Sequence, residues 1–479
     1  MGLTEKLTEN TAGQRSKNMI QIHNPYNGNF LGELREYTKA ELDSALQNAK
    51  AAQKDWAATS KHDRADILSR WAELLREHAG ELAELVMHEV GKTRSDAKKE
   101  VLRSAEYIEF TNQEFLHQDY EAMPGDNYSR DYQGKVAMVQ RRPLGLVLAI
   151  SPFNYPVNLS ISKISPALVT GNAVIFKPAT QGALSGTRIA ELLYEAGLDR
   201  RIMPVITGKG SEIGDYLTAH PLIDMISFTG STGVGNHIAD IVGGVPLVLE
   251  MGGKDAALVL DAAKLEVAAD EIIKGGFGYS SQRCTAIKRV IVLEELYDEL
   301  CGRLIEGAKG LSVGSPENEC VIVPLISKKS ADYVEELISD AKEKGATVLC
   351  GGGRRENLVE PTILTDVTKD MRIYYEEPFG PVFPIMAVRD IRQAISMAND
   401  SPYGLQCSIF MEDIDKALAI ANEIDVGSAQ INGRTERGPD NLPFLGVKNS
   451  GFGVQGVRSS IESMTRIKVN VLNLSAKID

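Results

Sequence analysis

One cysteine of this sequence stands in a setting suited to nucleophilic chemistry. Cys284 lies in the small, polar stretch GYSSQRCTAIKR, residues 278–289, directly after Arg283. A thiol attacks a carbonyl carbon as the thiolate, and an adjacent guanidinium stabilises that negative charge. A lone cysteine is, however, most often a small apolar residue that packs in a core. The stretch alone leaves both interpretations open.

Two further polar residues end apolar runs and could assist such a nucleophile. Asn154 stands in SPFNYP, where its amide could donate a hydrogen bond to a developing oxyanion. Glu250 ends the run PLVLE and is a candidate general base. Each also has a simpler interpretation, because Asn is a common turn residue and a charged residue often ends a strand.

A glycine turn and a lysine suggest a nucleotide. In ISFTGSTGVG an apolar run leads through a turn into a helix start, so that Gly230, Ser231 and Gly235 could bring backbone N–H groups to a pyrophosphate. In FKPAT, Lys177 and Thr180 follow another apolar run, where the ammonium could hold a phosphate or ribose. The turn could equally be a plain connection, and the lysine stem could pack on a sheet edge.

Most of the residues named above stand at or just after the ends of short apolar runs. Such runs alternate with helical stretches from residue 144 to 250 and again from 261 to about 431. The runs include RIMPVIT, residues 201–207, which we also expect to be a strand. Such alternation predicts an α/β protein with parallel sheets covered on both faces and with ligands beyond the carboxyl ends of the strands. The first 115 residues predict a short hairpin followed by amphipathic helices.

Composition narrows the class of protein. The 479 residues carry a net charge of -13, which disfavours a nucleic-acid partner. The five cysteines are odd in number and widely spaced, without a CxxC pair, so that we expect no metal and a reduced, cytoplasmic location. The first twenty residues are polar and unlike a signal peptide, and the apolar run at residues 146–150 is too short to cross a membrane.

Six of these windows together resemble one family. SPFNYP, FKPAT, FTGSTGVG, EMGGKDA, GYSSQRCTA and EEPFGP stand in the order and spacing of the aldehyde dehydrogenase superfamily, over nearly the whole chain. The resemblance implies Cys284 as nucleophile, Glu250 as general base, and Asn154 as oxyanion donor together with the Cys284 N–H. It implies a cofactor site that consists of Lys177, Thr180, Gly230, Ser231, Gly235, Glu377 and Phe379, with Glu377 on the nicotinamide ribose.

The same resemblance implies a domain organisation. We expect a Rossmann-type cofactor domain from residues 1–122 and 142–250, and an α/β catalytic domain from 251–445. A small β oligomerisation element would come from 123–141, which opens with a stretch rich in Gly, Asp, Asn and Ser, and from 460–479. We expect a homotetramer, a dimer of dimers, although the sequence leaves a dimer open.

Three local runs resemble one group in the superfamily, the non-phosphorylating glyceraldehyde-3-phosphate dehydrogenases: NYPVN, GYSSQRCTA and RTERGPDN. That group binds a substrate phosphate through three arginines and a tyrosine, and the matching residues here are Arg103, Tyr155, Arg283 and Arg437. Three guanidiniums in one cavity would repel one another without an anion, which favours a phosphorylated aldehyde. The resemblance implies oxidation of glyceraldehyde 3-phosphate to 3-phosphoglycerate through a Cys thioester that is hydrolysed without inorganic phosphate.

The cofactor choice follows from one residue. Many relatives that prefer NAD have Glu at the position of Thr180, where its charge would repel a 2′-phosphate. With that carboxylate absent, Lys177 could meet the phosphate, so we expect NADP, with NAD as a weaker alternative. Two other functions stay open: oxidation of another small anionic aldehyde, such as succinic semialdehyde or lactaldehyde, and a non-enzymatic structural or binding role on this fold.

Overall fold

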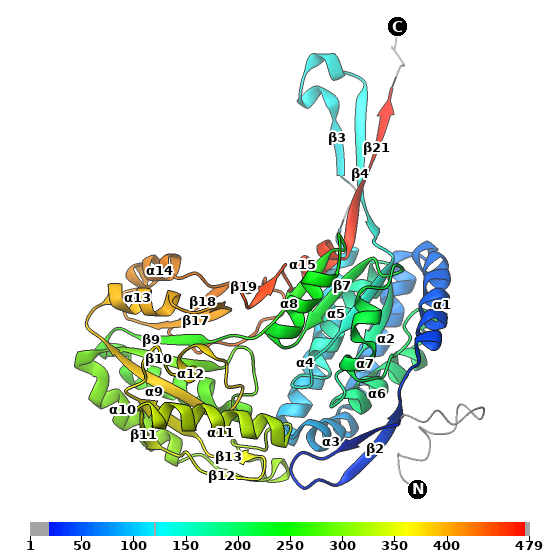
Figure 1. Cartoon of the computed structure of the whole chain (residues 1–479). Coiled ribbons are helices and arrows are strands. Elements are labelled where there is room, and N and C mark those ends of the chain that lie inside the picture. The colour runs from blue at the N-terminus through cyan, green and yellow to red at the C-terminus, as the bar shows by residue number, and fades with distance from the viewer. Residues whose placement is uncertain (1–18, 119–120, 475–479) are drawn as a thin grey trace.

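Two α/β units and a projecting arm make up the chain in a computed structural model that describes residues 19–118 and 121–474 (Figure 1). The predictions about the first eighteen residues and about the last five residues of the oligomerisation element lie outside the described residues. The predicted hairpin is present as β1 (Met19–His23) and β2 (Phe30–Arg35), which pair antiparallel.

Four helices follow, as the apolar spacing predicts. They are α1 (Lys39–Ala58), α2 (Lys61–Glu77), α3 (Ala79–Val90) and α4 (Arg94–Leu116). Thr38 starts α1 with a capping box, in which its side chain accepts from the Glu41 N–H while the Glu41 carboxylate accepts from the Thr38 N–H. Leu68 and Trp71 of α2 are fully buried, so the apolar stripe of this helix faces the core.

The first sheet has five strands in the order β20-β8-β7-β5-β6, and all but β20 are parallel. Its strands are β5 (Leu146–Ile150), β6 (Ala173–Lys177), β7 (Met225–Thr229), β8 (Leu247–Glu250) and β20 (Gly451–Phe452). The helices between them are α5 (Asn158–Val169), α6 (Ala183–Glu195), α7 (Gly210–Thr218) and α8 (Thr232–Ile241). β5, β6 and β7 are almost wholly buried, as continuous apolar runs predict.

The prediction of a strand over the whole of residues 201–207 is wrong. This segment makes only an isolated parallel bridge between Val205 and Phe176. Pro204 has no N–H to donate to a ladder, although its carbonyl accepts from the Phe176 N–H at 3.1 Å. Before the bridge the Ile202 carbonyl accepts from the Val174 N–H at 2.9 Å, so the segment runs beside β6 over residues 202–206 without forming a complete ladder.

The second sheet has seven strands in the order β11-β14-β15-β10-β9-β17-β18, with only β11 antiparallel to its neighbour. They are β9 (Asp255–Val259), β10 (Ile287–Leu293), β11 (Thr347–Cys350), β14 (Thr362–Thr365), β15 (Val382–Val388), β17 (Gln406–Phe410) and β18 (Ser428–Ile431). The helices of this unit are α9 (Leu265–Phe277), α10 (Glu294–Lys309), α11 (Lys328–Glu343), α12 (Arg372–Tyr375), α13 (Ile391–Asn399) and α14 (Ile414–Glu423). Two minor pairs add β12 (Arg354–Arg355) with β13 (Leu358–Val359), and β16 (Tyr403–Gly404) with β19 (Val447–Lys448).

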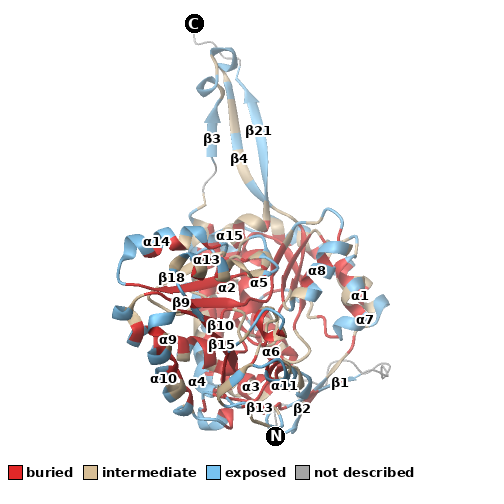
Figure 2. Cartoon of the chain, turned by 60° about the vertical axis from the view of Figure 1, so that its left-hand side comes forward, coloured by how far each residue is buried: buried red, intermediate tan, exposed pale blue. Residues whose placement is uncertain are grey.

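An arm of three antiparallel strands projects from the body (Figure 1). β3 (Glu121–Pro124), β4 (Lys135–Pro143) and β21 (Thr465–Asn473) form it, and α15 (Val457–Ser463) leads into β21. The arm is mostly exposed, as Figure 2 shows, and Ile467, Val469 and Val471 leave half or more of their surface in solvent. Exposed apolar side chains at alternate positions of one strand form a surface suited to contact with another protein chain.

The domain boundaries remain predictions. The parallel strands of the first sheet fall within residues 142–250 and the second sheet lies within 251–445, whereas β20 joins the first sheet from a later part of the chain. Among the described residues, every helix is too short or too polar to span a membrane.

Two glycines of the second α/β unit predict opposite outcomes on substitution by alanine. A Cβ at Gly427 would lie 1.8 Å from the Leu445 carbonyl oxygen, so Gly427→Ala should lower the free energy of unfolding by about 1–3 kcal/mol or more. Gly302 lies within α10 with nothing near an added Cβ, so Gly302→Ala should raise it by about 0.5–1 kcal/mol. Thermal unfolding of the two variants checks both signs, and equal midpoints would contradict the packing described here.

Candidate active site

The carboxyl ends of four parallel strands bring the predicted residues together. Asn154 follows β5, Lys177 ends β6, Thr229 ends β7 and Glu250 ends β8. The register pairs Ile150 with Lys177 and Thr229 with Glu250, so these ends lie along one edge of the sheet. That edge is where α/β sheets bind their ligands.

The loop that carries Cys284 has an unusual backbone. Residues 279–281 are three successive non-glycine residues with φ of 53°, 52° and 59°, in the left-handed region. That region costs an L-residue roughly 1–2 kcal/mol, so the turn persists only where other contacts hold it. The Ser280 hydroxyl donates to the Val323 carbonyl at 2.7 Å and accepts from the Val323 N–H at 2.8 Å. This reversal turns the chain from α9 toward β10 and places Cys284 between them.

The Cys284 thiol is largely neutral in the cofactor-free protein. Burial raises its pKa to about 12, and the carboxylate of Glu250 adds to that effect, while the ammonium of Lys288 opposes it. Lys288 is fully buried on β10, donates to the Cys284 carbonyl at 2.6 Å and lies 3.0 Å from a Glu377 oxygen. Arg283, which precedes the cysteine, donates to the Gly275 carbonyl at 2.5 Å, on the other side of the loop.

Asn154 lies beside this loop. Its buried Nδ2 donates to the Gln282 carbonyl at 2.9 Å, which fixes the amide and uses one of its two N–H groups. The second N–H remains for a ligand oxygen.

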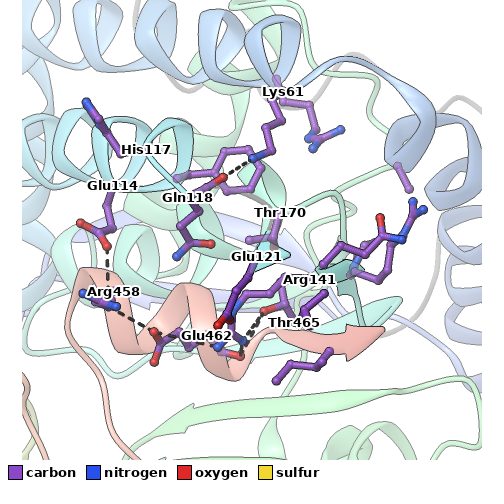
Figure 3. A pocket seen from close by; sticks show the side chains of 18 of the residues that line it. Lys61, Glu114, His117, Gln118, Glu121, Arg141, Thr170, Arg458, Glu462 and Thr465 are labelled. Atoms are coloured by element: carbon purple, nitrogen blue, oxygen red, sulfur yellow. Dashed lines mark hydrogen bonds and ion pairs between the residues drawn. The ribbon is translucent and has the colours of Figure 1, made fainter. Parts of the chain in front are cut away.

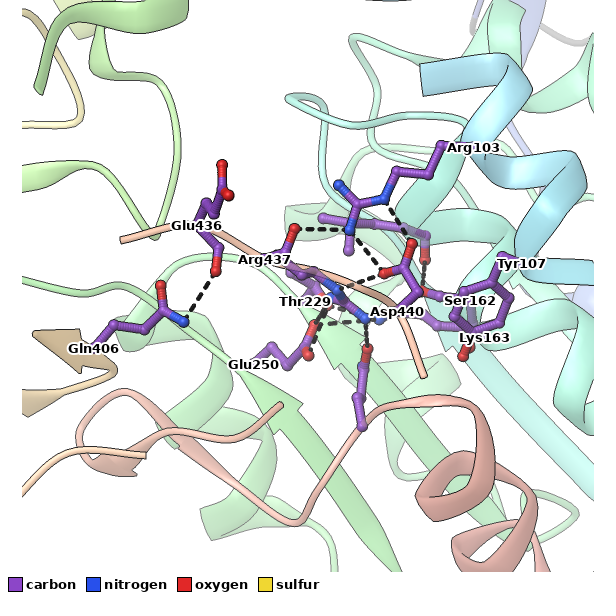
Figure 4. Close-up of polar contacts among 12 residues, drawn as sticks. Arg103, Tyr107, Ser162, Lys163, Thr229, Glu250, Gln406, Glu436, Arg437 and Asp440 are labelled. Atoms are coloured by element: carbon purple, nitrogen blue, oxygen red, sulfur yellow. Dashed lines mark hydrogen bonds and ion pairs between the residues drawn. The ribbon is translucent and has the colours of Figure 1, made fainter. Parts of the chain in front are cut away.

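Glu250 lies in a buried network of charges (Figure 4). The Thr229 hydroxyl donates to its Oε2 at 2.9 Å, and Arg437 Nη1 donates to Oε1 and Oε2 at 3.2 and 3.1 Å. Lys163, on α5, is fully buried 4.0 Å from Oε2, and burial lowers the pKa of its ammonium to about 8 although Glu250 acts to raise it. Two cations and a hydroxyl thus surround the Glu250 carboxylate.

A separate basic cavity of about 330 Å³ is lined by Arg103 of α4. Three of the four predicted phosphate ligands line it, Arg103, Tyr155 and Arg283, and its wall carries six basic and two acidic side chains. The Arg283 Nε is buried without a hydrogen-bond partner among the described residues. An unpaired buried donor in a cationic wall points to an anionic ligand.

The structure does not bring Arg437 to this cavity, which corrects the expectation that all four residues share it. The guanidinium of Arg437 is held instead by Glu250, by the Gln455 Oε1 at 2.9 Å and by Asp440. Arg434 lines the cavity instead. A direct contact between Arg437 and a phosphate stays a prediction.

The predicted nucleotide turn presents an uncapped helix. Ser231 is the N-cap of α8 and its side chain makes no cap hydrogen bond, so the first N–H groups of α8 remain available to an anion. Glycine is also needed here for packing, since a Cβ at Gly230 would lie 2.5 Å from Phe228 and one at Gly235 would lie 2.3 Å from the Met251 sulfur.

The other cofactor residues fit a nucleotide with an extra phosphate. Lys177 is buried at the end of β6, where burial lowers the pKa of its ammonium to about 8, and no carboxylate of the described residues lies within ion-pair distance. Thr180, half-buried, follows without adding negative charge. The Glu36 carboxylate acts to raise the pKa of Lys177 from beyond ion-pair distance, and a buried cation with no closer counter-ion is the environment that a 2′-phosphate would complete.

Glu377 and Phe379, the remaining two predicted cofactor residues, contact the glycines after β8 and the loop after β5. The Glu377 Oε1 accepts from the Gly253 N–H at 3.1 Å, and a Cβ on Gly252 would lie 2.1 Å from Oε2, so glycine is required for this approach. Phe379 has a φ of 46° and packs edge-to-face on Phe153 with 5.9 Å between ring centroids.

Sequence reasoning missed residues that act on the predicted ones. Lys288 stands four positions after Cys284, within the quoted stretch, and Asp440 stands within RTERGPDN. Each also pairs with a residue far away in the sequence, Lys288 with Glu377 and Asp440 with Arg103, which the sequence does not reveal. Lys163, Thr229 and Arg434 were missed for the same reason. Only the fold brings each of them to its partner.

Another cavity, of about 590 Å³, lies at the base of the arm (Figure 3). It contains none of the predicted site residues. Among the described residues, no group of three or more His, Cys, Asp or Glu side chains could hold a metal ion.

The comparison with known families decides the class. The sequence profile described as "Aldehyde dehydrogenase family" matches residues 11–470. The chain belongs to the aldehyde dehydrogenase family. The α/β fold predicted from the sequence is confirmed, and so is the resemblance to this family.

This aldehyde dehydrogenase is similar to characterised members along its whole length. It is 46% identical to NADP-dependent glyceraldehyde-3-phosphate dehydrogenase of Streptococcus equinus, over 96% of this chain and 97% of the relative, and 42% identical to the enzyme of that name from Nicotiana plumbaginifolia, over 95% and 92%. The crystal structure of NADP-dependent glyceraldehyde-3-phosphate dehydrogenase from Bacillus halodurans C-125 complexed with NADP is 51% identical, with a TM-score of 0.95 over 96% of this chain and 97% of that one.

The environment of Cys284 predicts a pH dependence. Because burial raises the thiol pKa to about 12, the rate of Cys284 alkylation by iodoacetamide in cofactor-free protein should rise about tenfold per pH unit from pH 7 to 9 without levelling off. The rate is measured as loss of the thiol in peptide mass spectra, with Cys284→Ser as the blank for the other four cysteines. An inflection at or below pH 9 would contradict the prediction.

Proposed function

We propose that this aldehyde dehydrogenase oxidises glyceraldehyde 3-phosphate to 3-phosphoglycerate with NADP, and that inorganic phosphate is not consumed. The observation that carries the proposal is the basic cavity beside the Cys284 loop, in which Arg103, Tyr155 and Arg283 meet and the Arg283 Nε lacks a partner. The relatives named above, which are NADP-dependent glyceraldehyde-3-phosphate dehydrogenases, support the same substrate and cofactor.

The reaction would begin at Cys284. The thiol would give its proton to solvent, a loss favoured by nearby backbone dipoles and by a bound cofactor. The thiolate would then attack the aldehyde carbon, and the resulting oxyanion would accept hydrogen bonds from the Asn154 amide and the Cys284 N–H. Bound NADP supplies the oxidant, because it accepts a hydride from the carbon that carries the sulfur. A thioester on Cys284 remains.

Hydrolysis completes the reaction. Glu250 takes a proton from a water molecule, the hydroxide oxygen bonds to the thioester carbon, and the C–S bond breaks to release the carboxylic acid and the cysteine. No histidine takes part, and the buried Thr229 hydroxyl, which donates to the Glu250 Oε2, orients the carboxylate for this step.

Cofactor selection would lie with the residues after β6. We propose that the Lys177 ammonium meets the 2′-phosphate of NADP, that the N–H groups at the start of α8 meet the pyrophosphate, and that Glu377 and Phe379 contact the nicotinamide half. Lys177 is supported by its burial without an ion pair, and the α8 terminus by its lack of a side-chain cap.

The arm would join subunits. We propose that β4 and β21 form the contacts of a homotetramer, supported by the exposed apolar side chains of β21. A cytoplasmic location, expected from cysteines that form no disulfide, stays part of the proposal.

The substrate assignment is tested with purified enzyme in phosphate-free buffer. NADPH should form from glyceraldehyde 3-phosphate with 3-phosphoglycerate as product, and much more slowly from succinic semialdehyde or lactaldehyde. A strict requirement for inorganic phosphate or coenzyme A would refute the hydrolytic route.

The phosphate cavity predicts a change in KM. Arg283→Leu removes a charge-assisted contact of about 1.5–3 kcal/mol, so the KM for glyceraldehyde 3-phosphate should rise roughly 10- to 100-fold. Arg303→Leu is the matched control, because Arg303 is an exposed residue of α10 paired with Glu299. Equal KM values for the two variants would remove Arg283 from the phosphate site.

The cofactor site predicts a loss of discrimination. Lys177→Met should weaken NADP binding at least tenfold and NAD binding less than threefold, because only NADP carries the phosphate that needs the ammonium. Titration of each nucleotide by calorimetry, with no aldehyde present, measures both constants. A parallel loss for both nucleotides would show that Lys177 contacts a part they share.

A further inference from the structure

A buried aspartate connects the basic cavity to the general base. Arg103, which lines the cavity, donates from Nε and Nη2 to the two carboxylate oxygens of Asp440 at 2.6 and 2.9 Å. On its other side the Asp440 Oδ1 lies 3.5 Å from the Arg437 Nε. Only 9% of the Asp440 side chain is exposed, so both arginines compensate a charge that water scarcely reaches (Figure 4).

Arg437 continues the connection to Glu250. Burial lowers the pKa of its guanidinium, but Glu250 and Asp440 outweigh that effect and raise the pKa, so the residue stays cationic. Four charged side chains therefore alternate in sign from the cavity to the base: Arg103, Asp440, Arg437 and Glu250. The Arg103 Nη2 also donates to the Arg437 carbonyl at 2.8 Å, which ties the same two arginines through the backbone.

We propose that Asp440 is a positioning residue that lets the phosphate of the substrate release Glu250 for hydrolysis. The inference rests on the proposed function and deepens it, because it assigns the phosphate a part in the chemical step as well as in binding. When an anion binds to Arg103, the Asp440 carboxylate interacts more strongly with Arg437.

The substrate phosphate and Asp440 compete for the Arg103 guanidinium, and this competition connects the basic cavity to Glu250. A phosphate dianion in the cavity competes with Asp440 for Arg103, since charge-assisted bonds from a guanidinium to phosphate and to carboxylate are similar in kind. A buried carboxylate that loses part of one partner strengthens its bond to the other. Among the described residues the ion pairs of Asp440 are with Arg103 and Arg437, so Arg437 is the partner that closes the 3.5 Å gap.

The movement of Arg437 changes Glu250. In the structure one guanidinium nitrogen reaches both Glu250 oxygens, so a water molecule that approaches the carboxylate must compete with Arg437 for them. As Arg437 turns to Asp440, Glu250 keeps its hydrogen bond from the Thr229 hydroxyl, which still orients it. With an aldehyde that lacks a phosphate, Arg437 would stay bound to Glu250 and hydrolysis would be slower. The preference of the enzyme for a phosphorylated aldehyde would therefore appear in kcat as well as in KM.

The test separates the phosphate from the aldehyde. Glyceraldehyde serves as the truncated substrate and inorganic phosphite as the missing dianion, with NADP at saturation. The hydrolysis rate constant is measured from the decay of the acyl-enzyme in acid-quenched samples. In the unmodified enzyme, phosphite should raise it at least threefold.

Asp440→Asn removes the carboxylate charge between Arg103 and Arg437, so phosphite should no longer raise the hydrolysis rate constant. The first burst of NADPH should stay within threefold of that of the unmodified enzyme. Glu436→Gln is the matched control, since Glu436 stands beside Arg437 in sequence, is half exposed and pairs with Arg434. It should keep the activation. Asp440→Glu should restore at least part of it, which a role limited to holding the loop would not require.

Each outcome bears on the inference. Activation below threefold in the unmodified enzyme, or the same activation in Asp440→Asn, would overturn it. These results differ from a failure of the proposed function, in which the unmodified enzyme would form no NADPH from glyceraldehyde 3-phosphate itself.

Discussion

A backbone reversal before the nucleophile is the constraint on which the site depends. Residues 279–281 hold left-handed dihedrals that side chains with a Cβ disfavour, and the reversal survives because Ser280 pairs with Val323 in both directions and its neighbours bond to other main-chain groups. The contacts with Val323 and Pro324 join the Cys284 loop to a segment about forty residues further along the chain, and the Tyr279 hydroxyl joins it to the Val90 carbonyl at the end of α3. Without them Cys284 would not meet the strand ends of the first sheet, and the thiol and the base would belong to separate units.

The second feature of the site is the number of buried charges that have more than one partner. Glu250 contacts Arg437 and Lys163, and Asp440 contacts Arg103 and Arg437. Removing a charge from water is expensive, so each of these groups needs its partners, and a new anion nearby redistributes them. An enzyme that must recognise a phosphate and also ionise a water can use one set of guanidiniums for both purposes. The basic cavity and Glu250 are connected in this way by the ion pairs of Arg103, Asp440 and Arg437.

Sequence reasoning reached the α/β fold and assembled the strand-end residues Asn154, Lys177 and Glu250, because apolar runs and the polar residue that ends each run are local signals. The same reasoning extended RIMPVIT into a strand, since the pattern of apolar residues outweighed the missing N–H of Pro204. It placed Arg437 with Arg103 and Arg283 in the basic cavity, where the structure shows Arg434. The choice between two arginines three positions apart depends on which one meets Glu250, and that pairing spans 187 residues of the chain. No periodicity or motif spacing carries such information.

The central claim is that Cys284 carries the substrate as a thioester. Acid quenching of the enzyme within the first turnover with glyceraldehyde 3-phosphate and NADP, followed by peptide mass spectrometry, measures where the acyl group is bound. The account predicts a phosphoglyceroyl mass on the peptide that contains Cys284, present only when NADP is added. An acyl group on another cysteine, or NADPH formed at full rate by Cys284→Ser, would contradict it.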